Sequence, residues 1–166
     1  MPYPVRSIAN AIINRAAADG KKIEHLKLQK LLYYANGYYL AAYEIPLIDH
    51  TFEAWDYGPV VPALYRDLRS FSAKPITRPV KDLDWDTGEM VPVPTPVNAP
   101  DVEKVIDFTW CTYGKYDGWQ LSEMTHRPDS PWDKTRKANP GIKDADITRE
   151  LLQEHFEGLI RRPANG

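Results

Sequence analysis

The chain has 166 residues, of which 43% are hydrophobic and 27% charged, as is typical of one soluble globular domain covering residues 1–166. Its formal net charge of −2 argues against a nucleic-acid partner, which would require a basic surface, and no run approaches the ~20 apolar residues of a membrane span. The single cysteine excludes an internal disulfide, and the N-terminus lacks the apolar stretch of a signal peptide, so we expect a cytoplasmic protein.

The first half of the chain predicts three helices. Residues 4–18 carry apolar side chains three and four positions apart, which indicates one buried face. Residues 26–43 are apolar over most of the helical circumference, as expected of a helix in the centre of a bundle. Within this helix, Gly37 either allows another backbone to approach closely or only lowers helix propensity. An extended piece at 52–55 and a reversal at Tyr57-Gly58-Pro59 precede a third helix over 62–71.

The second half opens with a proline-rich stretch, residues 74–100, that allows at most one edge hairpin because proline cannot donate to a strand ladder. We expect four further helices: one capped by Asn98, one over 119–125, one begun by a Ser130–Asp133 capping box, and a last one capped by Asp146. The predicted fold class is mainly α, a compact helical domain with a small β or loop insertion around residues 74–100.

The sequence contains no pattern that predicts a cofactor, a metal or a catalytic group. No two histidines are three to five residues apart, and no glycine-rich phosphate loop occurs. Cys111 would need His25 or His126 nearby to act as a nucleophile, and we favour a small buried hydrophobe beside a tryptophan instead. Asp133 is interpreted as a capping acid, and Asp56 as a turn residue that bonds its own backbone.

Basic residues suggest at most a local patch. Lys27 and Lys30 share one helical face, and Arg66 and Arg69 lie on or near the third helix. They form either a basic patch or a solvated rim whose lysine stems cover apolar surface, and the negative net charge favours the rim.

Aromatic residues are the unusual feature of this chain. Tyr39, Trp110 and Tyr113 fall on apolar stripes and are expected in the core. Other rings lie in turns or beside charges: Trp55, Tyr57, Tyr65, Trp119 and Trp132. Tryptophan, tyrosine and arginine dominate the affinity of protein interfaces. We therefore predict a partner-binding surface built from Trp55, Tyr57, Tyr65, Arg66 and Trp132. The alternative for Trp55 and Trp132 is that they pin loops to the bundle.

Three strings of the sequence carry a family resemblance. Lys27–Ala35 reads KLQKLLYYA, Phe52–Pro62 reads FEAWDYGPVVP, and Leu121–Arg127 reads LSEMTHR with Ser130-Pro131-Trp132 following. These strings closely resemble the Panacea domain family, which includes SocA-like antitoxins and phage-associated proteins, and the resemblance runs from about Val5 to Ala138. It implies a mainly helical antitoxin domain that neutralises a toxin from a neighbouring reading frame by direct contact. It offers no catalytic residues.

Two alternatives remain beside direct neutralisation. The resemblance to the SocA branch also implies an adaptor that presents the toxin to the ClpXP protease, with a second contact site in residues 74–100 or beyond Leu159. The alternative from another class is a small hydrolase that uses Cys111 or a carboxylate pair.

Overall fold

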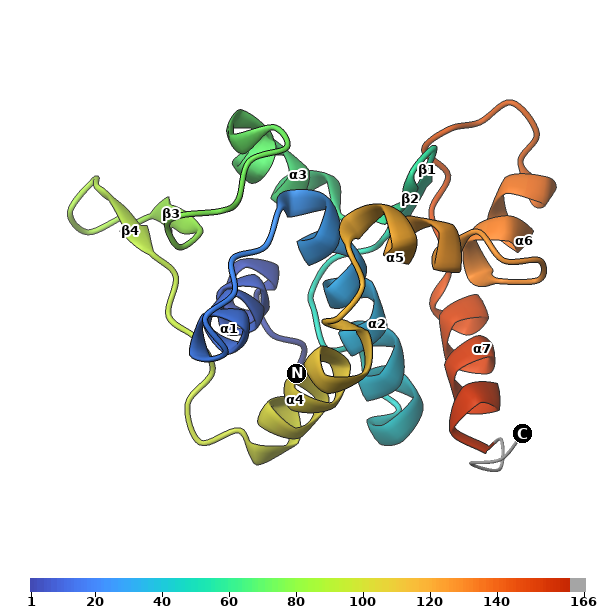
Figure 1. Ribbon diagram of the computed structural model, residues 1–166, viewed down its shortest axis with the longest axis horizontal. Coiled ribbons are helices and arrows are strands. Elements are labelled where there is room, and N and C mark those ends of the chain that lie inside the picture. The colour runs from blue at the N-terminus through green and yellow to red at the C-terminus, as the bar shows by residue number, and fades with distance from the viewer. Residues whose placement is uncertain (162–166) are drawn as a thin grey trace.

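The computed structural model describes residues 1–161, and its centre is a single helix, α2 (His25–Tyr43). Around it pack α1 (Val5–Ala18), α4 (Pro100–Tyr113), α5 (Gly118–Thr125) and α7 (Arg149–Arg161) (Figure 1). Twelve of the nineteen residues of α2 are buried, on every side of the helix. The prediction of a mainly α fold with a central helix is therefore confirmed.

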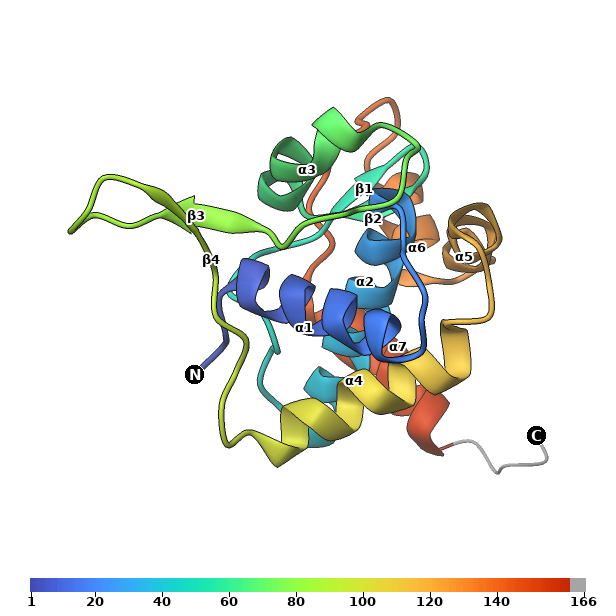
Figure 2. The same cartoon turned by 60° about the vertical axis from the view of Figure 1, so that its left-hand side comes forward.

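Two short antiparallel hairpins interrupt the helices. The strands β1 (Glu53–Trp55) and β2 (Gly58–Val60) pair beside α2, with Trp55 opposite Gly58. The helix α3 (Pro62–Leu68) and a 3-10 turn, η1 (Arg69–Phe71), follow. The strands β3 (Lys81–Leu83) and β4 (Met90–Pro92) form the second hairpin, which stands away from the helices (Figure 2). The proline-rich stretch thus holds the single hairpin that its sequence allows.

The base of the second hairpin is held by a buried side chain of α1. The amide nitrogen of Asn10 donates to Val80 O and Val93 O, both at 2.9 Å, and its oxygen accepts from Val80 N at 2.7 Å. Ser7 Oγ donates to Pro94 O at 2.6 Å. These bonds satisfy the backbone polar groups at the points where β3 and β4 connect to the helical domain, so the base of the hairpin is fixed to α1.

Two of the predicted helix caps, Asn98 and Asp146, are wrong, and the predicted capping box at Ser130 forms only in part. The helix α4 begins after Ala99, and Asn98 precedes it in the left-handed region with a φ of 54°. Asp146 forms an isolated bridge with Glu53, while Thr148 Oγ1 accepts from Leu151 N at the start of α7. At α6 (Pro131–Ala138), Ser130 caps as expected, but the carboxylate of Asp133 accepts from Asp129 N instead of completing the box.

Gly37 marks the closest approach between α2 and α7. A Cβ at this position would overlap the ring of Phe156, which is fully buried. A side chain, rather than another backbone, therefore explains this glycine. Among residues 1–161, no helix has the length and apolar character that would be needed to cross a membrane.

Gly37→Ala is expected to lower the free energy of unfolding by about 1–3 kcal/mol, because the added methyl displaces the Phe156 ring from a packed site. Urea denaturation measures the change. The control is Gly158→Ala in α7, where a Cβ meets nothing within 4 Å and the better helix former should stabilise by up to about 1 kcal/mol. Equal effects of the two substitutions would contradict the packing argument.

Candidate functional site: an aromatic groove held by the central helix

Two polar side chains of α2 hold the backbone that follows the first hairpin. Gln29 accepts from Val61 N at 2.9 Å and donates to Val61 O at 3.1 Å. Lys30 donates from Nζ to Pro59 O at 2.9 Å. Gln29 and Lys30 belong to the first sequence string, Lys27–Ala35, and Pro59 and Val61 belong to the second, Phe52–Pro62. The two strings are therefore hydrogen-bonded to each other in the core. Lys30 is completely buried, so its assignment to a basic patch or solvated rim was wrong.

Gly58 is required where Lys30 passes under the turn. Its φ of +106° is a left-handed conformation that side chains rarely adopt. A Cβ there would also lie 2.8 Å from Lys30 Cε and 2.6 Å from Thr125 Oγ1. From the same helix as Thr125, Ser122 Oγ donates to Tyr57 O at 2.6 Å. The turn is therefore held from below by α2 and from one side by α5.

Burial changes the protonation of this layer. It lowers the pKa of Lys30 to about 7, since no carboxylate accompanies the amine. His126 lies nearby, stacked on the ring of Trp132 at 3.9 Å between centroids. Burial, together with the charge of Lys30, lowers the pKa of His126, whose buried Nε2 has no hydrogen-bond partner within residues 1–161. Burial therefore shifts both groups toward their neutral forms in the folded protein.

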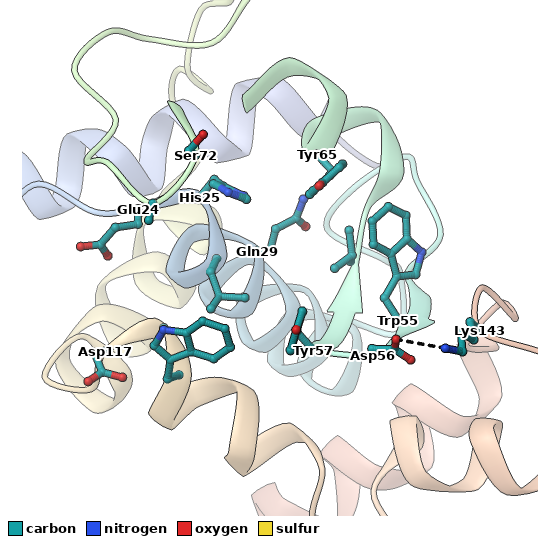
Figure 3. A pocket seen from close by; sticks show the side chains of 15 residues that line it. Glu24, His25, Gln29, Trp55, Asp56, Tyr57, Tyr65, Ser72, Asp117 and Lys143 are labelled. Atoms are coloured by element: carbon teal, nitrogen blue, oxygen red, sulfur yellow. Dashed lines mark ion pairs between the residues drawn. The ribbon is translucent and has the colours of Figure 1, made fainter. Parts of the chain in front are cut away.

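Above this layer lies a groove of about 670 Å³, formed by the start of α2, the β1–β2 turn, α3 and the start of α5 (Figure 3). We call it the aromatic groove, because four of its lining residues are Trp55, Tyr57, Tyr65 and Trp119. The rings form two edge-to-face pairs. The ring centroids are 5.0 Å apart in the pair of Trp55 and Tyr65, and 5.3 Å apart in the pair of Tyr57 and Trp119. Leu26, Gln29 and Val60 also line it.

The structure brings three of the five predicted partner-binding residues into this groove: Trp55, Tyr57 and Tyr65. Arg66 is exposed on α3 and does not line it. Trp132 lies on the other side of β1, where its Nε1 donates to Trp55 O at 2.7 Å and the Arg136 guanidinium covers its ring. Its contacts are those of a residue that holds β1 against α6.

Trp119 lines the groove but was not among the residues chosen from the sequence. Its signal was local: it follows Asp117-Gly118 in the first turn of a short helix, which leaves the ring on the surface. Asp117 Oδ1 accepts from Gln120 N at 2.8 Å, and the Gln120 side chain accepts from Asp117 N at 2.9 Å. This capping box orients the first turn of α5 and, with it, the indole.

Charged side chains border the groove at two ends. Glu24 and Asp117 lie at one end, and Asp56 and Lys143 at the other (Figure 3). Asp56 lies in the turn between β1 and β2, as predicted, but its carboxylate forms ion pairs with Arg136 at 2.9 Å and Lys143 at 3.6 Å instead of bonding its own backbone. These cations lower the pKa of Asp56, with the Arg136 hydrogen bond as the main cause.

The residues considered for catalysis are not arranged for it. Cys111 is exposed on α4, which corrects the prediction that it is buried. It lines a separate hollow with Lys21, Lys22 and Lys115, whereas His25 lines the aromatic groove. Within the described part of the chain, no three His, Cys, Asp or Glu side chains form a group that could hold a metal ion.

Comparisons with known proteins identify relatives of this chain. The sequence matches the family model described as "Antitoxin SocA-like, Panacea domain" over residues 28–133. It is 35% identical over 128 residues to "Antitoxin SocA" of Caulobacter vibrioides (strain NA1000 / CB15N), an alignment that covers 77% of this chain and 68% of that protein. No solved structure matches. The matched range includes Gln29, Lys30 and all four rings of the aromatic groove.

Lys30 predicts a rise of stability with pH above neutrality. Its pKa is about 7 in the folded protein and about 10.4 when unfolded, so between these values the unfolded chain binds one more proton. The free energy of unfolding should therefore rise, by at most about 1.4 kcal/mol per pH unit. Urea denaturation at pH 7.5, 8.5 and 9.5 measures this slope.

Lys30→Met, which keeps the apolar stem, should remove this part of the pH dependence. His25 and His126 face Lys30, but their lowered pKa values place their titration below this range. The same slope in wild type and variant would show that the amine does not titrate as described.

Proposed function

The chain belongs to the SocA-like Panacea domain family of antitoxins, and from this premise we propose that it neutralises a cognate toxin by direct protein–protein contact at the aromatic groove. One observation carries the proposal: two pairs of aromatic rings, one exposed and one partly buried, line a hollow whose backbone is held from inside by Gln29 and Lys30. Clusters of tryptophan and tyrosine in such hollows supply most of the affinity in protein interfaces.

The groove suits a polypeptide partner for two reasons. Tyr57 and Trp119 are 60% and 62% exposed, so large apolar areas remain to be covered. Ser122 already bonds the backbone oxygen of Tyr57, and the Asp117–Gln120 capping box fixes the helical turn that carries Trp119, so binding orders little additional chain and loses little entropy. Covering a toxin's working surface requires no chemical step, so we propose that the protein acts by occlusion and not as an enzyme.

The hydrolase alternative makes a different prediction for Cys111. Because its side chain lies on α4, outside the aromatic groove, Cys111→Ala should neutralise the toxin as well as the wild type does. Growth rescue on co-expression with the toxin measures this. Loss of rescue by a folded Cys111→Ala protein would favour the hydrolase.

One observation favours an adaptor role as a second candidate. Delivery of a toxin to the ClpXP protease needs a contact surface outside the groove, and the β3–β4 hairpin offers one. Trp85, on the hairpin loop, is 88% exposed, although Asn10 holds the hairpin base. An equal toxin half-life in protease-containing cells with and without this chain would exclude delivery.

Trp119→Ala should weaken toxin binding at least tenfold while the melting temperature stays nearly constant, because the ring contributes exposed area rather than core packing. Isothermal titration calorimetry and a thermal melt measure the two quantities. Trp85→Ala is the control, since it removes an even more exposed indole from a surface away from the groove and should bind as the wild type does. Equal affinities of both variants would contradict the groove as the toxin site.

A further inference from the structure

We propose that the aromatic groove binds a cationic side chain of its protein partner, preferably an arginine, inserted between the rings. This inference rests on the proposed function and specifies the chemistry of the same site. The groove combines two features that each attract a cation: electron-rich ring faces and unpaired carboxylates.

The four rings line the groove as two separate pairs and do not form one continuous apolar surface. Trp55 and Tyr65 come from β1 and α3 and form one pair, whereas Tyr57 and Trp119 come from the turn and α5 and form the other. Gln29 lies between Tyr65 and Tyr57 in Figure 3. A side chain that enters the hollow therefore meets rings from both pairs, and a cation held over a ring face is bound more strongly when it is desolvated.

The charges at the rim have the complementary sign. Three carboxylates, Glu24, Asp56 and Asp117, line the groove against one ammonium group, Lys143. Asp56 is neutralised by its ion pairs with Arg136 and Lys143. Across residues 1–161, the ion pairs within 4.0 Å include neither Glu24 nor Asp117, so this end of the groove keeps two unpaired negative charges.

The nearby basic groups form no ion pair with these two carboxylates within the described residues. Lys27 is close enough for both carboxylates to act on its pKa, but its Nζ donates to Gly114 O at 2.6 Å and lines the separate hollow beside Trp110. His25 does line the groove, and burial, with the charge of Lys30, lowers its pKa and so favours its neutral form. Glu24 and Asp117 are therefore available to a cationic group of a partner.

An arginine fits these features better than the alternatives. Its planar guanidinium stacks on aromatic rings while its N–H groups reach carboxylates at the edge. A purely apolar side chain would fill the hollow but leave Glu24 and Asp117 without a cationic partner. An acidic side chain would be repelled by both of them.

The test removes the charges of Glu24 and Asp117 without changing the size of their side chains. In the double variant Glu24→Gln, Asp117→Asn, the amides keep the volume, and asparagine caps a helix as well as aspartate does. Titration against the purified product of the reading frame next to this chain's gene should show at least a tenfold rise in Kd. The salt dependence of Kd should also become flatter, because screened charge pairs have been removed.

The matched control is Asp86→Asn, Glu89→Gln, which removes the same two charges from the exposed loop of the β3–β4 hairpin. It should bind as the wild type does. A second pair of variants distinguishes the contribution of the aromatic face from that of apolar volume. Trp119→Phe keeps an aromatic face and should retain more affinity for the partner than Trp119→Leu, which keeps apolar volume alone.

The outcomes separate this inference from the proposed function. If the wild type binds, Trp119→Ala fails to bind, and both the neutral double variant and Trp119→Leu bind normally, the groove grips an apolar segment and the cation inference is overturned while the proposed function stands. If the wild type does not bind the neighbouring product, the proposed function is overturned, and this inference falls with it.

Discussion

A buried amine under a backbone turn is the constraint on which the rest of this structure depends. Lys30 reaches Pro59 O from the central helix, and Gln29 bonds both polar groups of Val61 two residues further on. A buried backbone group without such a partner would be costly, so these bonds determine where the chain turns after β2 and where α3 begins. The position of this turn also fixes the positions of the rings of Trp55, Tyr57 and Tyr65.

The same constraint explains the unusual chemistry of the layer below the groove. Lys30 has a carbonyl as its partner and no carboxylate, and burial therefore lowers its pKa toward neutrality. Gly58 lies against the side-chain carbons of Lys30, and His126 lies near Lys30, stacked on Trp132. Polar groups in this layer hold the backbone of the site in place, whereas rings and carboxylates line the groove above it.

The arrangement also accounts for the way the family's recurring strings are spread along this chain. They lie on α2, on the first hairpin and on α5, and in three dimensions they meet at one place. Ser122 bonds Tyr57 O, Thr125 crowds Gly58, and Trp132 bonds Trp55 O from behind. A surface assembled from three segments can keep its geometry while the exposed ring faces contact different polypeptides, which is the property that we propose for a protein that works by covering another.

The sequence alone determined the helical stripes, the central place of residues 26–43, the hairpin allowed by the prolines and the family, because hydrophobic period and proline chemistry act locally. It also indicated Trp55, Tyr57 and Tyr65 as surface rings. It could not place Lys30, because a lysine on a helix is read as solvated unless the carbonyl that receives it is known, and Pro59 lies 29 residues away. For the same reason Cys111, Asp56 and Trp119 were misjudged or passed over. Their neighbours are brought by other elements, and only the packing of α2, α3 and α5 around the first hairpin decided which rings and carboxylates share one groove.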